Sequence, residues 1–195
     1  MMDRVDENDF GAAAGPTVPV VHRGTAGAAS GGLTPTVFLL VGLTGSGKTT
    51  YATRVLEPAG AVRLSVDERV HARYGRYGVD YPEHRYFELE APVVAEVRER
   101  LAELVAAGTD VVLDHGLWLQ RDRDQWKKLV SEVGGRWRLL YFPVPKGELL
   151  RRLRERNQRD DANALTVTAS ALDDFYERFD VPEDEGEETV ESGSF

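Results

Sequence analysis

The chain has 195 residues and a mass of 21.6 kDa, enough for one α/β domain with a substantial core and short for two. It contains no cysteine, which excludes a disulfide scaffold and cysteine-ligated metal sites, and its four histidines are scattered, which argues against a histidine metal site. No apolar run approaches the ~20 residues of a membrane span, and residues 1–35 lack the layout of a secretory signal. We therefore expect a soluble cytoplasmic protein.

The net charge of −9 is concentrated at the two ends of the chain. Residues 1–34 carry −2 and residues 180–195 carry −7, which leaves residues 35–179 neutral, with 22 acidic and 22 basic side chains. A nucleic-acid partner usually requires a basic stripe, so the neutral body argues against one. Because the N-terminal segment is rich in Gly, Ala, Pro and Thr without hydrophobic periodicity, we predict a disordered leader. The predicted organisation is a leader at 1–34, a domain at 35–180 and a loose acidic tail at 181–195.

Strand and helix patterns alternate between these ends. Residues 37–41 form an apolar run typical of a strand buried on both faces. A long helical pattern spans 83–107, where Pro92 predicts either a kink or the start of a second helix and Gly108 predicts a stop. Strands separated by helices predict a parallel sheet of four strands, or of five if the stretch around 189–190 adds one. The further predicted elements are strands at 61–66, 111–114 and 138–142 and helices at 47–56, 121–133, 146–157 and 170–178.

Residues 42–49, GLTGSGKT, satisfy the pattern G-x-x-x-x-G-K-[ST] directly after a predicted buried strand and at a helix start. Glycines allow a tight turn that points successive backbone N–H groups at phosphate oxygens, and the helix N-terminus adds positive potential. Lys48 supplies a cation for the β- and γ-phosphates, and Thr49 offers a hydroxyl to Mg²⁺. The residues expected to bind the nucleotide here are Gly42, Thr44, Gly45, Ser46, Gly47, Lys48, Thr49 and Thr50.

Two aspartates lie at the ends of predicted strands. Asp114 closes the strand at 111–114, where a carboxylate can reach Mg²⁺, although an Asp at this place can equally cap the following helix. The next residue is His115 and not the water-activating glutamate common in motor ATPases, which argues against a hydrolytic enzyme. Asp67 ends the strand at 61–66, and ligands gather at the carboxyl ends of parallel strands. It is therefore the candidate base for an acceptor hydroxyl, with a helix N-cap as the alternative.

Aromatic and arginine side chains are expected around the acceptor. Residues 69–87 are rich in both, and such an insert can close over an acceptor or form ordinary core. The residues after the third predicted strand, including Arg123, face the same presumed cavity, and His115 is either structural or catalytic. The candidate acceptor-binding residues are Asp67, Arg73, Tyr86, His115, Trp118 and Arg121.

The predicted helix at 146–157 is rich in arginine. Its leucines define a buried stripe at 100° per residue, and Arg152 and Arg156 lie along one side of it, with Arg159 beyond. These side chains can reach a transferring phosphate and stabilise its charge, or they form a solvated face. We take Arg152 as a nucleotide contact and Arg156 as the candidate catalytic arginine of a lid.

The chain resembles the small P-loop kinases grouped as the AAA domain family, which are related to zeta toxins, chloramphenicol phosphotransferase and polynucleotide kinase. The resemblance covers roughly residues 36–188 and rests on VFLLVGLTGSGKTT, RLSVDE, VVLDHGLW, LLYFPVP, ELLRRLRERN and FYERFDVPEDEGE. It implies a three-layer α/β/α P-loop NTPase fold of the nucleoside-kinase type. It also implies Asp67 as catalytic base, Lys48 and Thr49 on nucleotide and magnesium, and arginines around Arg156 as a lid.

Together these features predict an ATP- and Mg²⁺-dependent phosphotransferase that moves the γ-phosphate to a hydroxyl of a small molecule, with antibiotic inactivation as one use. Two alternatives stay open at this point. A kinase of polynucleotide 5′-hydroxyl ends would use the same machinery on another acceptor. A non-catalytic nucleotide-dependent switch or partner-binding module would bind ATP without transfer.

Overall fold

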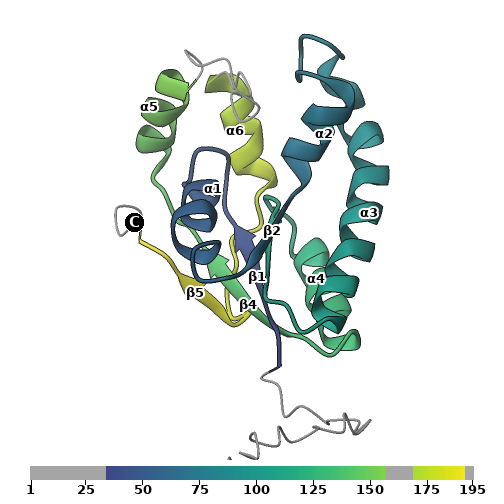
Figure 1. The fold of residues 1–195 in the computed structure, drawn as a ribbon. Helices are drawn as coiled ribbons and strands as arrows, with labels where there is room; N and C mark the ends of the chain where they lie inside the picture. The colour runs from purple at the N-terminus through teal and green to yellow at the C-terminus, as the bar shows by residue number, and fades with distance from the viewer. Residues whose placement is uncertain (1–33, 157–168, 192–195) are drawn as a thin grey trace, which may run out of the picture. The chain divides into compact units, whose positions relative to one another are not determined.

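The computed structural model describes residues 34–156 and 169–191, and five parallel strands form one sheet in the order β2-β3-β1-β4-β5 (Figure 1). The strands are β1 (Thr36–Val41), β2 (Val62–Ser65), β3 (Val111–Asp114), β4 (Arg136–Tyr141) and β5 (Glu187–Thr189). The predicted α/β fold with a parallel sheet is confirmed. The short β5 supplies the fifth strand by pairing with β4, where Leu139 lies opposite Glu187 and Tyr141 opposite Thr189.

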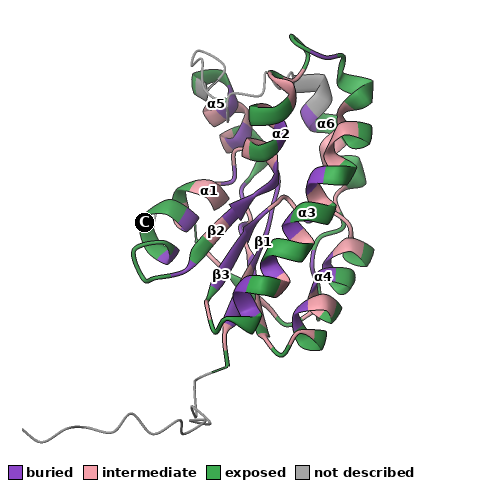
Figure 2. Ribbon diagram, turned by 45° about the vertical axis from the view of Figure 1, so that its right-hand side comes forward, coloured by how far each residue is buried: buried purple, intermediate pink, exposed green. Residues whose placement is uncertain are grey.

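Helices cover both faces of the sheet. They are α1 (Lys48–Tyr51), continued by the π-helical η1 (Ala52–Leu56), α2 (Val66–Tyr74), the short 3₁₀ turn η2 (Glu83–Arg85), α3 (Tyr86–Ala106), α4 (Gln120–Glu132), α5 (Lys146–Arg156) and α6 (Ala169–Arg178). Side chains alternate across β1, so Leu39 packs in the cluster that α3 and α4 share, while Leu40 packs against Leu56 of η1. Figure 2 shows the buried positions gathered on the strands and on one side of α3.

Two helices, α5 and α6, pack together beyond the carboxyl ends of the strands (Figure 1). Leu149 and Leu153 of α5 and Leu172 of α6 bury their side chains with Leu43 of the loop after β1. The hydrophobic stripe of α5 thus holds the arginine-bearing helix against the end of the sheet where ligands bind in parallel α/β folds.

Pro92 does not start a second helix, because α3 runs through it from Tyr86 to Ala106. The carbonyl that loses a hydrogen-bond donor at Pro92 belongs to Glu88, which is exposed and open to water. The predicted stop at Gly108 is confirmed: its φ is +80°, and its N–H donates to the carbonyl of Val105 at 2.9 Å.

The prediction that the acidic tail is loose was wrong for residues 181–191. This segment contributes β5, and Glu188 forms an ion pair with Arg138 of β4. The acidic residues are ordered because basic side chains of α4 and β4 lie opposite them. The predicted leader at 1–34 falls almost wholly outside the described residues, all of which belong to one compact unit, Gly32–Phe195.

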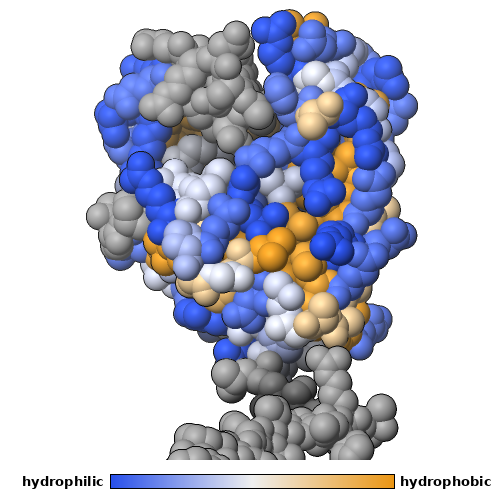
Figure 3. All heavy atoms as spheres, viewed as in Figure 1, coloured by the Kyte–Doolittle hydropathy of each residue, from blue (hydrophilic) through white to orange (hydrophobic). Residues whose placement is uncertain are grey.

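Within residues 34–156 and 169–191, no helix combines the length and the apolar content needed to cross a bilayer. Figure 3 shows a mostly hydrophilic face, with hydrophobic side chains reaching the surface near its centre.

Candidate active site

The loop between β1 and α1 folds tightly around the ammonium group of Lys48. Its Nζ donates to the carbonyl oxygens of Gly42 at 2.7 Å and Leu43 at 3.0 Å, and to Ser46 Oγ at 3.4 Å. Gly42 has a φ of +152°, and a Cβ there would lie 2.9 Å from Ser46 Oγ and 3.1 Å from the carbonyl oxygen of Phe142. Only glycine accommodates this close approach, which explains the first glycine of the motif.

Eight of the nine predicted nucleotide-binding residues lie on this loop or in the first turn of α1. Ser46 is buried, whereas Thr50 is exposed. Arg152 of α5 reaches the same loop, because its Nη1 lies 3.4 Å from the carbonyl oxygen of Gly45. Its Nε donates to Glu148 at 2.6 Å, which holds the guanidinium in place. The predicted proximity of Arg152 to the phosphate loop is therefore present in the fold.

The other two lid candidates are not placed in this way. Arg156 is the last residue of α5, and its side chain lies outside the described part of the chain. Arg159 lies outside the described residues altogether. The choice of Arg156 as the catalytic arginine stays a prediction.

Asp114 is buried at the end of β3, with 5% of the residue exposed. It does not cap a helix, since the N-cap of α4 is Leu119. Burial raises the pKa of Asp114, while Lys48, a hydrogen bond with Thr49, and Arg63 oppose that rise. The carboxylate and the Thr49 hydroxyl are oxygen donors of the kind that Mg²⁺ prefers, so these two residues fit the cation predicted for them.

Arg63 is a member of the site that sequence reasoning missed. It projects from β2, and its Nη1 donates to Asp114 Oδ2 at 2.9 Å. Its Nη2 donates to both carboxylate oxygens of Glu68 at 2.8 Å. Arg63 therefore fixes the orientation of the Asp114 carboxylate. The sequence feature that could have identified Arg63 is its position as a charged residue in the middle of a short strand.

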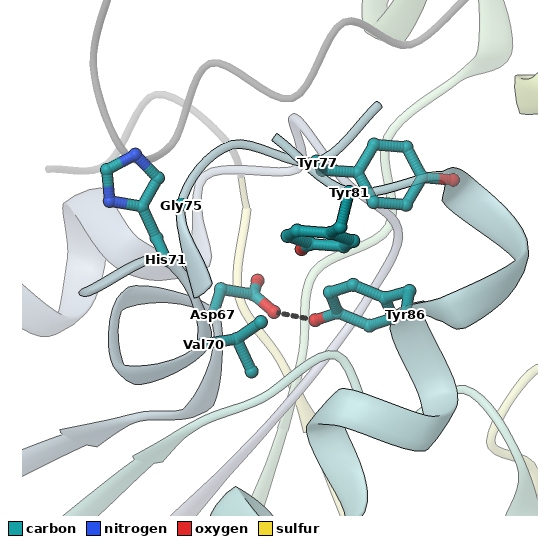
Figure 4. Close-up of a pocket in the computed structure, with 7 residues that line it drawn as sticks. All are labelled: Asp67, Val70, His71, Gly75, Tyr77, Tyr81 and Tyr86. Carbon is teal, nitrogen blue, oxygen red and sulfur yellow. Dashed lines mark hydrogen bonds between the residues drawn. The ribbon is translucent and has the colours of Figure 1, made fainter. Parts of the chain in front are cut away.

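Asp67 lies in the first turn of α2, two residues after β2 ends. It is not the N-cap, because Ser65 Oγ accepts the hydrogen bond from the backbone N–H of Glu68 at 3.3 Å. The hydroxyl of Tyr86 donates to Asp67 Oδ1 at 2.6 Å (Figure 4). Burial, together with the charges of Asp67 and Glu90, raises the pKa of Tyr86, so this hydroxyl keeps its proton and orients the Asp67 carboxylate.

Glu90 of α3 and His115, which follows β3, complete a cluster with Asp67. One ligand atom from each of the three lies within 4.8 Å of the others, and His115 Nδ1 is 3.8 Å from Glu90 Oε1. Burial raises the pKa of Glu90, which His115 opposes and Asp67 reinforces. This set can hold a cation or accept hydrogen bonds from a polar ligand. Glu90 was missed, although a carboxylate four residues after Tyr86 lies on the buried stripe of the helix, where acids are rare.

Only some of the residues predicted to bind the acceptor lie near Asp67. Arg73 lies six residues along α2, on a different side of the helix, and forms an exposed ion pair with α3. The side chain of Arg121 is 76% exposed. Trp118 packs on Phe175 of α6 with ring centroids 4.7 Å apart. Of the predicted acceptor set, Tyr86 and His115 are the ones that lie beside Asp67.

Arg123 was expected to face the acceptor and is instead completely buried. Its Nε and Nη2 contact the carboxylate of Glu185 at 2.9 and 2.5 Å, and its Nη1 donates to the carbonyl oxygens of Leu117 and Trp118 at 3.0 and 3.1 Å. Lys127 Nζ also donates to Glu185, at 3.0 Å. The burial of Arg123 could have been predicted from its position three residues before Trp126, on the buried stripe of α4.

The sheet order, the phosphate loop at the end of β1 and the acidic groups at the ends of β2 and β3 define a P-loop kinase-like fold. The chain belongs to the AAA domain family, whose model matches residues 37–182. A comparison with curated protein sequences found no match.

Solved structures share this fold at low sequence identity. A candidate kinase from Chloroflexus aurantiacus J-10-fl is 17% identical with a TM-score of 0.62, covering 81% of this chain and 85% of its own. A gluconokinase from Sinorhizobium meliloti 1021 is 16% identical with a TM-score of 0.54, covering 81% and 82%. A chain of the Pnkp1/Rnl/Hen1 RNA repair complex is 21% identical with a TM-score of 0.56, covering 83% of this chain and 53%, about half, of its own.

Proposed function

We propose that this chain is an ATP-dependent kinase that transfers the γ-phosphate to a hydroxyl of a small molecule, with Asp67 as general base. The observation that supports this proposal is the charge arrangement at one end of the sheet. Ser65 at the end of β2 lies opposite Asp114 at the end of β3, and a carboxylate oxygen of Asp67 lies within 4.8 Å of a ring nitrogen of His115, the residue after Asp114. Lys48 and a hydrogen bond with Thr49 act on Asp114 from the phosphate loop and oppose the rise of its pKa. A base for the acceptor and a cradle for the donor are thus adjacent, as phosphoryl transfer requires.

Each residue has a definite part in the proposed reaction. Lys48 and the backbone N–H groups of the loop bind the phosphates, and Arg152 adds positive charge at the edge of this loop. Thr49 and Asp114 would hold a Mg²⁺ ion, which would neutralise negative charge on the phosphates. Asp67 accepts the proton of the acceptor hydroxyl while the hydroxyl oxygen forms a bond to the γ-phosphorus. The bond between the γ-phosphorus and the β-phosphate oxygen breaks, which releases ADP. Tyr86 holds the Asp67 carboxylate in position through its hydrogen bond.

The test is incubation of the full chain with ATP, Mg²⁺ and a panel of hydroxylated metabolites and antibiotics, with products followed by mass for the gain of one phosphoryl group. Asp67→Asn should lower turnover by at least about a hundredfold while leaving ATP binding intact. Asp124→Asn, an exposed change on α4, is the matched control and should retain full turnover.

Other outcomes would overturn the proposal in recognisable ways. Transfer only to the 5′-hydroxyl of an oligonucleotide would identify a polynucleotide kinase. ATP binding without transfer to any compound, and an unaffected Asp67→Asn variant, would indicate a switch or binding module. Phosphate release without an acceptor would indicate a hydrolytic ATPase. Antibiotic inactivation is supported only if an antibiotic in the panel gains a phosphoryl group.

A further inference from the structure

A small pocket lies beside Asp67. Its lining residues come from α2, from the segment that follows it and from the start of α3, and Figure 4 shows Tyr81 and Tyr86 beside the Asp67 carboxylate with Tyr77 farther from it. The lining residues are Asp67, Val70, His71, Gly75, Tyr77, Tyr81 and Tyr86.

The aromatic wall of this pocket is held together by contacts among its own rings. Tyr77 lies edge-to-face with Tyr86, with ring centroids 5.6 Å apart, and edge-to-face with Tyr81 at 6.2 Å. The loop that carries them is closed by a hydrogen bond from Gly78 N–H to the carbonyl oxygen of Tyr81 at 3.0 Å. The wall is therefore organised without a ligand, which lowers the entropic cost of binding one.

The electrostatic character of the pocket is acidic. Asp67 lies at its base, Glu90 and His115 lie next to Asp67, and Glu83 acts on Tyr77. His71 also lines the pocket, and Arg178 opposes the rise that burial and Glu83 cause in the pKa of Tyr77.

Three of the four arginines at 69–87 are paired with carboxylates, and the fourth, Arg69, is exposed and lies two residues after Asp67, on the opposite side of α2. The described ion pairs of this segment are Arg73 with Glu96, Arg76 with Asp80 and Arg85 with Glu88. The charge of the paired arginines is balanced locally, so within residues 34–155 and 172–191 a phosphate or carboxylate on the acceptor would face Asp67 and Glu90 without a dedicated cation. Like-charge juxtaposition of this kind strongly disfavours a ligand.

We propose, on the basis of the kinase function above, that Glu90 is an acceptor-binding residue and that the acceptor is uncharged or cationic, with a second hydrogen-bond donor beside the reacting hydroxyl. The reacting hydroxyl donates to Asp67, and the neighbouring O–H or N–H of a vicinal diol or amino alcohol donates to Glu90. The C–H face or ammonium group of the same compound packs against the tyrosine wall. Anionic acceptors are excluded by the two carboxylates.

The acceptor panel tests this proposal when it is built in matched triplets: glucose, glucosamine and glucuronate, and glycerol, serinol and glycerate, with a 5′-hydroxyl oligonucleotide added. We expect transfer to neutral or amine-bearing members, with kcat/KM on the order of a hundredfold above the acidic member of the same triplet. Preference for the neutral member indicates a diol, and preference for the amine indicates an amino alcohol. Transfer confined to acidic members or the oligonucleotide overturns this proposal and leaves a kinase; no transfer to any compound overturns both.

Glu90→Gln tests the residue itself. It should raise the acceptor KM about tenfold, leave the KM for ATP unchanged and improve the relative turnover of the acidic compounds. Glu96→Gln is the matched control on the same helix, where an exposed glutamate binds Arg73, and should change none of these values. Should Glu90→Gln fail to fold, Glu90→Asp keeps the charge and should still raise the acceptor KM while retaining discrimination against acids. If the folded Glu90 variant matches Glu96→Gln, Glu90 does not bind the acceptor.

Discussion

Replacing Arg123 by methionine should strongly destabilise the protein, because the change removes every polar contact of a completely buried guanidinium. Methionine has similar length and no N–H group, so the Glu185 carboxylate, 5% exposed, would lose its bidentate partner. The carbonyl oxygens of Leu117 and Trp118 would lose their donor as well. Breaking a buried ion pair from one side costs about 3–5 kcal/mol. Lys127 still reaches Glu185 at 3.0 Å, so we expect about 3 kcal/mol.

The assay is urea unfolding at neutral pH, with Arg138→Met as the matched control. Arg138 also pairs with a glutamate of the C-terminal segment, Glu188, but the two side chains are 42% and 46% exposed. An exposed pair is worth less than about 1 kcal/mol, so the control should lose little. Equal losses in the two variants, or a loss below about 1 kcal/mol for Arg123→Met, would refute the argument from burial.

The same pair predicts a pH dependence. The hydrogen bond from Arg123, aided by Lys127, lowers the pKa of Glu185 below its ordinary value of 4.5, against the opposing effect of burial. The stabilisation is therefore present above that ordinary value and is lost as the pH falls through the lower folded-state value. The difference in unfolding free energy between wild type and Arg123→Met should narrow in acid; a constant difference would contradict this origin.

Three further changes test other parts of the site. Gly42→Ala places a methyl group 2.9 Å from Ser46 Oγ at a φ of +152°, so titration calorimetry should show loss of ATP binding, and unchanged affinity would contradict the close approach. Burial raises the pKa of Glu90 above its ordinary 4.5, so its contribution to stability declines as the pH rises through the folded-state value. Glu90→Gln should therefore gain stability relative to wild type above that value. A difference in melting temperature between the two proteins that does not change with pH would contradict this prediction. Arg73→Ala removes an exposed ion pair and should leave turnover unchanged, whereas a tenfold fall would return Arg73 to the acceptor site.

The phosphate loop was predictable because its structure is local. The turn, the positive φ values and the helix start are all encoded within residues 42–49, and the buried strand before them is a continuous apolar run. Asp67 and Asp114 were found by a topological rule, since parallel strands bring their carboxyl ends to one edge of the sheet. The same rule does not say which residues of a following helix face the site, so Arg73 was predicted to bind the acceptor although its side chain pairs with Glu96 of α3.

The missed residues depend on partners distant in the sequence. Arg63 and Asp114 are 51 residues apart, and Arg123 and Glu185 are 62 residues apart. Periodicity shows that Arg123 and Glu90 occupy buried stripes. It does not show that Glu185 pairs with Arg123 or that Tyr86 lies beside Glu90. The acidic C-terminal segment was misread for the same reason: its charges look solvated until β4 and α4 are placed beside it.

Asp67 is carried by a helix and not by a strand, and α2 packs on α3, which supplies both Tyr86 and Glu90. In the proposed reaction, the acceptor is therefore bound by the hairpin of α2 and α3, and the nucleotide is bound by the loop that follows β1. On that proposal, substitutions within the hairpin would change which compound is phosphorylated and leave the nucleotide-binding loop unchanged. Such an arrangement would let one fold serve many acceptors through changes confined to residues 66–106.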